Sequence, residues 1–299
     1  MAKLKYWIEA FRLRTLPLAL STILMGSFLA VASGIYNYNV IALALITTLL
    51  LQTLSNLAND YGDGLKGTDN HERLGPMRAL QSGQIRPGQM KIAIYIFVLL
   101  SLISGVLLII EAFGSDWYLG LIFLFLGISA IAAAIKYTVG KKAYGYSGFG
   151  DIFVFIFFGL IAVMGSYFLN TLTLNYSVIL PSISMGLFST AVLNLNNMRD
   201  IKNDLASGKK TLAAKMGLEK AKKYHLLLIS IGMLAAIVYT RFNFTSAWNL
   251  IYLICFPMFL IQLRNIFKIQ NQKLLDPYLK KLALTTLLFS VLFGIGLVL

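Results

Sequence analysis

The sequence predicts an all-α membrane protein in which nine transmembrane helices surround a central cavity. Hydrophobic residues make up 58% of the 299-residue chain, and the mean hydropathy is +0.75, well above that of ordinary soluble domains. Apolar runs of about twenty residues recur along the chain, and each is long enough to cross the hydrocarbon layer as a helix. The runs are continuously apolar rather than alternating, which argues against a transmembrane β-barrel.

The apolar runs place the helices in chain order, with polar connections between them. We expect helices over residues 16–34, 39–59, 91–110, 117–135, 149–169, 177–195, 224–240, 247–263 and 281–298. The residues before the first run are amphipathic and aromatic, which is typical of a helix that lies in the membrane interface. We therefore expect one transmembrane domain over 1–299, of which 1–15 form an interfacial segment.

The positive charge indicates the orientation of the chain. There are 26 Lys and Arg against 12 Asp and Glu, which gives a formal net charge of +14. With the N-terminus in the cytoplasm, every Lys and Arg except Arg241 falls in the N-terminal segment or near a cytoplasmic connection. This is the positive-inside distribution. The charge therefore indicates topology and contact with membrane lipid, with no need for nucleic acid, and it places the C-terminus outside.

The first of two acidic stretches follows the second predicted helix. Asn56, Asp60 and Asp63 are spaced four and three residues apart, so on a helix they share one face. Asn59 lies four residues before Asp63, and Asp69 follows in the connection. Five of the twelve acidic residues of the chain lie in this stretch and its counterpart.

The second acidic stretch follows the sixth predicted helix and is similar to the first. Asn196, Asp200 and Asp204 are spaced four and four residues apart, so on a helix they also share one face. Four spans separate the two helices, so both run in the same direction and both stretches lie on the cytoplasmic side. The pattern favours a parallel internal repeat.

Carboxylate and amide oxygens in this arrangement suit a hard cation. Mg²⁺ prefers one or two carboxylates together with water and phosphate oxygens. Two half-sites facing one cavity would hold a diphosphate through Mg²⁺. The candidate metal ligands and catalytic residues are Asp60, Asp63, Asp69, Asp200 and Asp204. The alternative is that these acids only pair with neighbouring Lys and Arg or face water, and the matching Asn offsets argue against it.

Basic residues in the connections complete the expected phosphate site. Arg78, Lys141, Arg199 and Lys210 are candidates for binding a leaving diphosphate, although topology alone also explains each of them. The other candidate substrate-binding residues are Asn56, Asn59, Tyr137 and Asn197. Asp151 begins the fifth span, where helix capping explains it and a part in acceptor or metal binding is the alternative.

These motifs resemble those of a known family. Residues 59–69 resemble the first aspartate motif of the UbiA superfamily of intramembrane prenyltransferases, and residues 197–212 resemble its second motif. Residues 54–69, 75–83 and 137–151 are most similar to the branch that prenylates 1,4-dihydroxy-2-naphthoate. In 4-hydroxybenzoate members an Asp stands at the place of Gly67, whereas the last acid here is Asp69.

The resemblance implies nine helices and a specific reaction. A polyprenyl chain would pass from polyprenyl diphosphate to 1,4-dihydroxy-2-naphthoate with loss of CO₂ and diphosphate, forming demethylmenaquinol for menaquinone biosynthesis. The five acids would hold Mg²⁺, and aromatic faces such as Tyr137 would shield an allylic cation. The protein would lie in the bacterial cytoplasmic (inner) membrane with its site facing the cytoplasm. The alternatives are another aromatic acceptor and, in a different class, a cation-coupled transporter, which the gathering of acids at one end disfavours.

Overall fold

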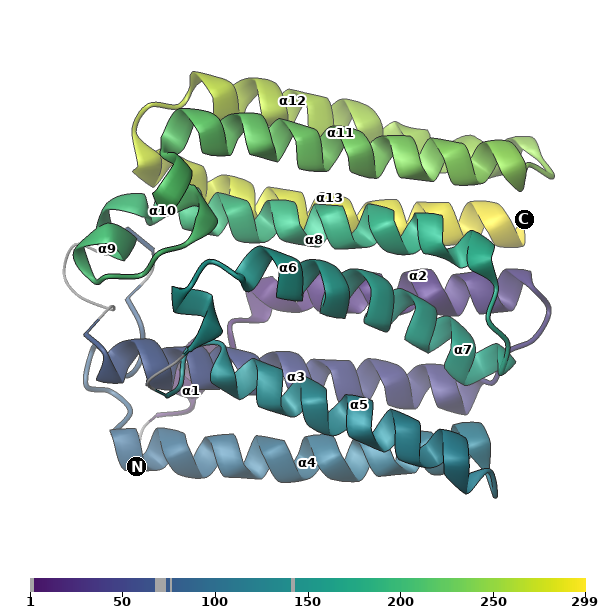
Figure 1. The fold of residues 1–299 in the computed structure, drawn as a ribbon, viewed down its shortest axis with the longest axis horizontal. Helices are drawn as coiled ribbons and strands as arrows, with labels where there is room; N and C mark the ends of the chain where they lie inside the picture. Colours follow the sequence, from purple (N-terminus) through teal and green to yellow (C-terminus); the bar gives the residue numbers. More distant parts are fainter. Residues whose placement is uncertain (1–2, 68–73, 76, 141–142) are drawn as a thin grey trace.

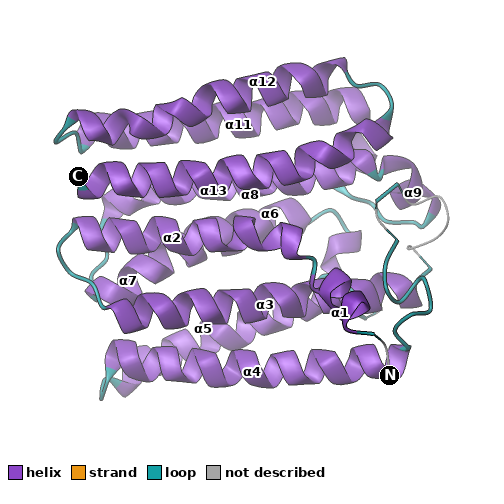
Figure 2. Cartoon of the chain, turned by 180° about the vertical axis from the view of Figure 1, so that it is seen from behind, coloured by secondary structure: helices purple, strands orange, loops and turns teal. Residues whose placement is uncertain are grey.

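The computed structural model describes residues 3–67, 74–75, 77–140 and 143–299, and these form a bundle of helices that run nearly side by side along its long axis (Figure 1). Among the described residues, nine helical segments are long and apolar enough to cross a membrane, which confirms the predicted number of spans. No strand occurs in this part of the chain (Figure 2). The protein is therefore an integral membrane protein of the all-α class.

The N-terminal half consists of four spans preceded by a short helix. Its elements are α1 (Leu4–Phe11), η1 (Leu13–Thr15), α2 (Leu16–Ala32), α3 (Tyr38–Leu65), α4 (Pro87–Phe113) and α5 (Trp117–Lys136). Helix α1 lies beside the end of α3 (Figure 2). The separate α1 agrees with a distinct N-terminal segment, and its position in the membrane interface stays a prediction.

The C-terminal half consists of five spans, several of them built from two or three helical pieces. Its elements are η2 (Tyr144–Tyr146), α6 (Gly150–Val154), the π-helix η3 (Phe155–Met164), α7 (Gly165–Thr171), η4 (Tyr176–Val178), α8 (Ile179–Arg199), α9 (Ile201–Ala206), α10 (Leu212–Met216), α11 (Leu218–Phe242), η5 (Ala247–Ile254), α12 (Cys255–Lys268), η6 (Gln272–Leu275) and α13 (Asp276–Val298). The N- and C-termini lie at opposite ends of the bundle (Figure 1).

Several helices extend beyond their apolar runs. Helix α3 continues to Leu65 and α4 begins at Pro87, a residue that suits the first turn because its missing N–H would be unpaired there. At the other end of α3, the Asn37 side chain caps the helix by accepting from the Asn39 N–H at 2.8 Å. Hydropathy marks only the apolar part of a helix, whereas caps decide where its hydrogen bonding stops.

The second acidic stretch departs from the single helix face predicted for it. Helix α8 ends at Arg199 and α9 begins at Ile201, with Asp200 between them. The cause is visible at the break, because Arg199 pairs with its direct neighbour Asp200, and adjacent side chains on a continuous helix do not face each other. Helix-like spacing persists, since the Asp204 N–H donates to the Asp200 carbonyl at 2.8 Å.

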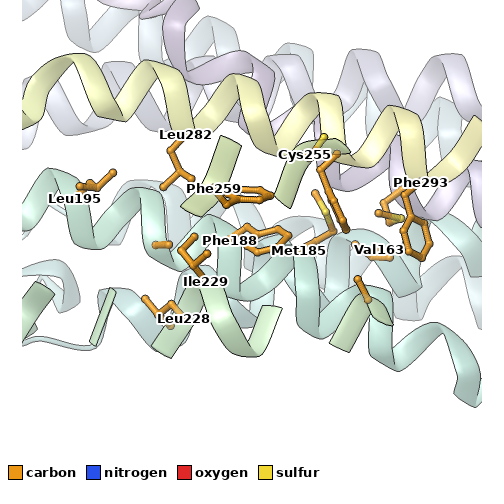
Figure 3. Packing of buried hydrophobic residues seen from close by; sticks show 14 of the residues in the cluster. Val163, Met185, Phe188, Leu195, Leu228, Ile229, Cys255, Phe259, Leu282 and Phe293 are labelled. Carbon is orange, nitrogen blue, oxygen red and sulfur yellow. The ribbon is translucent and has the colours of Figure 1, made fainter. Parts of the chain in front are cut away.

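The main hydrophobic core lies in the C-terminal half. Phe188 of α8 stacks on Phe259 of α12 with ring centroids 4.6 Å apart, and the edge of Phe289 of α13 meets Phe188 at 5.1 Å (Phe188 and Phe259 in Figure 3). Offset and edge-to-face pairs of this kind are favourable aromatic contacts. This aromatic core stabilises the C-terminal half of the bundle.

Close helix packing positions the wall between the core and the cavity. A Cβ on Gly159 of η3 would lie 2.7 Å from the Gly186 Cα of α8 and 2.8 Å from the Ser182 carbonyl oxygen. Only glycine allows these two backbones to approach so closely, as is common between membrane helices. The π-helix is thereby fixed against α8, and several of its other residues, among them Phe157 and Ile161, line the cavity.

A cavity of about 870 Å³ lies between these elements. Its lining runs from Asp63 and Lys209 at one end of the bundle to Leu119 and Leu174 toward the other, and most of it is apolar. Helix α5 and η3 form much of the wall. Ile131 is the one residue of α5 that is buried in the protein, so this side of the cavity is covered by a single thin layer.

Candidate active site

The two acidic stretches lie at the same end of the bundle, as the sequence predicts. The last turns of α3 carry the first stretch, and the junction of α8 with α9 carries the second (Figure 1). Asp60, Asp63 and Asp204 are each 3% exposed or less, and Asp200 is 7% exposed. Buried carboxylates require partners, and each of these four has at least one.

Asp60 is held by two arginines from opposite directions along the chain. Its Oδ1 accepts from the Arg12 guanidinium, which comes from the segment between α1 and η1. The same oxygen accepts from Arg78 Nη1 at 2.7 Å. Arg78 is a predicted substrate-binding residue, whereas Arg12 carried no sequence signal beyond its charge.

Asp63 connects the first acidic stretch to the loop after α5. Tyr146 donates its hydroxyl to Asp63 Oδ1 at 2.8 Å, and Arg78 Nη2 lies 3.5 Å from Oδ2. The close approach depends on Gly62, where a Cβ would lie 2.6 Å from Thr138 Oγ1. Glycine at this position lets the end of α3 and the residues that follow α5 touch.

Asp204 pairs with a buried lysine. Lys209 Nζ lies 4.0 Å from Asp204 Oδ1, and Thr211 donates its hydroxyl to Oδ2 at 3.2 Å. Burial raises the pKa of Asp204 to about 6 in spite of the nearby ammonium. Burial also disfavours the Lys209 ammonium, but the charges of Asp63 and Asp204 outweigh it and raise the pKa of Lys209. Lys209 is therefore a cation between the two acidic stretches.

Tyr146 joins the two halves of the site. The Lys66 ammonium lies 3.9 Å from the centre of its ring, and the Lys209 ammonium lies 5.3 Å from it. The Tyr146 carbonyl accepts from the Lys210 N–H at 2.9 Å. One tyrosine thus contacts an acid of the first stretch and the basic residues that follow the second.

Arg199 and Asp200 form a buried network with a further acid. Arg199 is fully buried and donates to both oxygens of Asp200, through Nε at 2.9 Å and Nη2 at 2.5 Å. It also pairs with Asp276 at the start of α13, while Nη2 reaches Asn196 Oδ1 at 2.9 Å. These bonds hold the α8–α9 junction against α13. The predicted binding of substrate by Arg199 stays a prediction.

The predicted asparagines differ in their surroundings. Asn56 donates to the Phe11 carbonyl at 2.8 Å and to Thr15 Oγ1 at 2.9 Å, so it holds the N-terminal segment. Asn59 lines the cavity and accepts from Thr138 Oγ1 at 3.2 Å. Asn197 is buried in α8. Asn56 and Asn59 both line the cavity, whereas Asn197 does not belong to its lining.

Tyr137 lines the cavity at the point where the polar end meets the apolar wall, and its part in substrate binding stays a prediction. Its ring meets Tyr144 edge to face with centroids 5.3 Å apart, and Tyr144 stacks on Phe153 at 4.0 Å. Burial and the charges of Asp151 and Asp63 raise the pKa of Tyr137, so its hydroxyl stays protonated. These rings present π-faces and edges beside the acidic end.

Asp69 and Lys141 fall outside the residues that the structure describes. Of two adjacent lysines, the structure brings Lys209 into the cavity lining, whereas the predicted Lys210 is exposed and contributes its backbone. Asp151 is buried in the first turn of α6, and its Oδ1 has no hydrogen-bond partner.

Sequence reasoning missed Arg12, Lys209, Tyr146 and Asp276. Tyr146 lay within a motif that the resemblance covered, and Lys209 stood beside a chosen residue. No pattern pointed to Arg12 or Asp276, because each reaches the site only through the packing of a chain terminus. Contact in space, rather than spacing in sequence, identifies both.

The donor set fits Mg²⁺ that arrives with a diphosphate. Among the described residues, no three His, Cys, Asp or Glu side chains converge into a ready metal cage, because arginine and lysine stand between the acids. Mg²⁺ is usually bound by one or two carboxylates plus substrate phosphates rather than by an all-protein cage. The interposed cations are also the groups that bind phosphate oxygens.

Comparisons with known proteins agree with this geometry. The model of the UbiA prenyltransferase family matches residues 19–295. The chain is 42% identical to the 1,4-dihydroxy-2-naphthoate octaprenyltransferase of Haemophilus influenzae over 99% of this chain and 96% of that protein. It is 41% identical to the protein of the same name from Escherichia coli, with the same coverage.

Solved structures show the same fold at low sequence identity. A UbiA homologue from Aeropyrum pernix aligns with a TM-score of 0.69 at 15% identity, covering 95% of this chain and 97% of the other. A UbiA homologue from Archaeoglobus fulgidus, bound to DMAPP and Mg²⁺, aligns with a TM-score of 0.60 at 16% identity, covering 96% and 98%.

Proposed function

Because the chain belongs to the UbiA prenyltransferase family, we propose that it transfers a polyprenyl chain from polyprenyl diphosphate to 1,4-dihydroxy-2-naphthoate. Diphosphate and CO₂ leave, and the product is demethylmenaquinol, a precursor of menaquinone. The observation that carries the proposal is the pair of acidic helix ends around Lys209 and Tyr146, at the mouth of a long apolar cavity.

The acceptor assignment rests on the relatives rather than on the cavity. Two proteins at 41–42% identity over nearly the whole chain carry the name of the naphthoate enzyme. The cavity contributes the donor side of the argument, because its apolar wall suits a prenyl chain and its polar end suits a diphosphate.

The metal would be held by the carboxylates of both stretches. We assign this role to Asp60, Asp63, Asp69, Asp200 and Asp204, and substrate binding to Asn56, Asn59, Arg78, Tyr137, Lys141, Asn197, Arg199 and Lys210. When bound, Mg²⁺ neutralises the diphosphate and stabilises its departure. Lys209 is added to the substrate-binding set because it lines the cavity between the acids.

The residues of the chain then act on the two substrates in distinct ways. Arg78 and Lys209 donate to the phosphate oxygens as negative charge develops on the leaving group. The apolar wall holds the prenyl chain and excludes water from the allylic carbon. Tyr137, Tyr144 and Phe153 offer aromatic faces to positive charge beside the acidic end.

We further propose that the acidic end faces the cytoplasm in a bacterial inner membrane. The basic residues gather near the connections on that end, which the positive-inside rule assigns to the cytoplasm. In this orientation the N-terminus is inside and the C-terminus outside.

The purified protein in lipid nanodiscs tests this function. We expect Mg²⁺-dependent formation of prenylated naphthoquinol from polyprenyl diphosphate and 1,4-dihydroxy-2-naphthoate. Asp63→Asn and Asp200→Asn should each lose activity by at least about a hundredfold, because each removes a proposed ligand of the metal that stabilises the charge of the leaving group. Asp116→Asn is the matched control, because Asp116 caps α5 at Leu119 N–H, a role that Asn also fills.

Two results would contradict the proposal. The first is wild-type turnover in both site variants. The second is prenylation of a different aromatic acceptor, such as 4-hydroxybenzoate, with no product from the naphthoate. The second outcome would keep the prenyltransferase chemistry and assign the acceptor to another branch of the family.

A further inference from the structure

The segment that joins α1 to α2 is anchored to the first acidic stretch. Asn56 donates to the Phe11 carbonyl and to Thr15 Oγ1, at 2.8 and 2.9 Å, so it bonds to both sides of Arg12. Gln52, one turn earlier on α3, lies 3.4 Å from the same hydroxyl. Residues Leu4–Thr15, which we call the N-terminal strap, are therefore fixed to α3 on each side of one residue.

That residue has an unusual backbone. Arg12 has φ 50° and ψ 58°, a left-handed conformation that is strained for a residue with a Cβ. Leu172 is the one other non-glycine residue with positive φ in the described part of the chain. The surrounding bonds hold Arg12 in this conformation, and its side chain reaches Asp60.

Two guanidinium groups compete for one carboxylate there. Arg12 and Arg78 both bond to Asp60 Oδ1, and their side chains are 18% and 10% exposed. Like charges held so close repel each other, so the arrangement depends on the charge of Asp60. A divalent cation at Asp60 would add to this repulsion and would take the oxygen that the two arginines share.

The cavity offers Arg12 a second anionic partner when a ligand is bound. Arg12 lines the cavity beside Arg78 and Lys209, and Asp63 is the one acid among the described lining residues. Asp60 and Asp204, which pair with these cations, do not belong to the lining, so a diphosphate that enters the cavity meets guanidinium and ammonium donors. Arginine is well suited to it, since its fork of donors matches two phosphate oxygens.

We infer that Arg12 exchanges partners during binding: it neutralises Asp60 in the empty site and moves to the diphosphate when Asp60 takes up the metal. The inference rests on the proposed function for the identity of the ligands. It makes the N-terminal strap a ligand-responsive element and Arg12 a diphosphate-binding residue. Asp60 stays neutralised at every stage, first by arginine and then by the metal.

The exchange predicts effects of opposite sign in Arg12→Gln. Mg²⁺ alone should bind at least threefold more tightly, because its competitor for Asp60 is gone. Inorganic diphosphate in the presence of Mg²⁺ should bind at least tenfold more weakly, because one of its donors is gone. Calorimetry on protein in nanodiscs measures both. Lys5→Gln is the matched control, since it removes an exposed charge from the same strap and should change neither value.

A second readout follows the strap itself. Trp7 of α1 lies against Phe11, the residue immediately before Arg12, with ring centroids 6.5 Å apart. In a variant with Trp117→Phe and Trp248→Phe, the emission of Trp7 should change when Mg²⁺ and diphosphate are added together. The change should be lost in Arg12→Gln and kept in Lys5→Gln.

Three outcomes would overturn the exchange. The first is weaker binding of both Mg²⁺ and diphosphate in Arg12→Gln, and the second is no effect on the binding of either ligand. The third is an unchanged Trp7 emission when the variant that keeps Arg12 and has Trp7 as its single tryptophan is saturated with Mg²⁺ and diphosphate. Arg12→Lys guards against misfolding, since it keeps the charge and should give intermediate affinity for both ligands. No acceptor is present in these measurements, so absence of naphthoate turnover would refute the proposed function and leave this test intact.

Discussion

Tyr146→Phe removes a single oxygen atom from the contact between the two halves of the site. The hydroxyl donates to Asp63 Oδ1 at 2.8 Å, while the ring lies beside Lys66 and Lys209. Phenylalanine keeps the ring and therefore keeps both cation–π contacts. The substitution isolates the hydrogen bond that holds one proposed metal ligand in place.

The size of the effect follows from the charge of Asp63. A hydrogen bond to a charged group is worth about 1.5–3 kcal/mol. If the bond orients Asp63 for the metal, its loss lowers kcat/KM by about tenfold to about a hundredfold, at about 1.4 kcal/mol for each factor of ten. Tyr146→Leu should cost more, because it also removes cation–π contacts worth about 0.5–1 kcal/mol each.

The assay is the initial rate of prenyl transfer in nanodiscs, titrated with Mg²⁺. We expect Tyr146→Phe to need more Mg²⁺ for half-maximal rate. Tyr144→Phe is the comparison, because that hydroxyl donates to the Ala133 carbonyl at 2.9 Å and touches no acid. It should lower thermal stability slightly and leave the Mg²⁺ requirement alone. A Tyr146→Phe enzyme with the Mg²⁺ dependence and kcat/KM of the wild type would refute the orienting role.

Three further predictions concern stability and pH. Arg199→Met leaves Asp200 buried without its partner and should cost roughly 3–5 kcal/mol of stability, measured as a fall in Tm, and an unchanged Tm would contradict the network. Gly159→Ala should lower stability by about 1–3 kcal/mol because its methyl group overpacks the contact with α8. Gly165→Ala on the same span has open space around the new methyl group and should leave stability unchanged or raise it slightly, so an equal change of stability in the two variants would contradict the packing argument. The pKa of Asp204 is raised to about 6, so this carboxyl is protonated below that pH and the Mg²⁺ needed for half-maximal rate should rise by up to about tenfold per pH unit below 6. A Mg²⁺ requirement that stays constant from pH 7 to pH 5 would exclude Asp204 as a ligand.

The helices were predictable because a membrane leaves few choices. Backbone groups in hydrocarbon must pair within the chain, so an apolar run of sufficient length becomes a helix regardless of its neighbours. The predicted number of spans is confirmed for this reason. Their ends were less predictable, since α3 continues to Leu65 and α4 starts at Pro87, where caps and polar contacts decide.

The site was predictable only at its two acidic stretches, because their similar residue types and spacing can be recognised in the sequence. The spacing of Asp60 and Asp63 on a helix face placed both at the end of α3, and the matching stretch placed Asp200 and Asp204 near them. The break at Asp200 was missed, because it follows from the pairing of that residue with Arg199. Periodicity assumes that the helix continues and contains no information about such a local competition.

The sequence by itself determined the class of the protein, the number of its spans and the residues that carry its acidic charge. Each of these depends on local composition, which hydrophobic transfer and helical spacing convert directly into structure. The tertiary structure alone decided which cation meets which acid. Arg12 reaches Asp60 across 48 residues and Arg199 reaches Asp276 across 77, because packing of the chain ends brings them together. The separation of two residues along the sequence does not show whether they meet in the folded protein, so such pairs are found only in the tertiary structure.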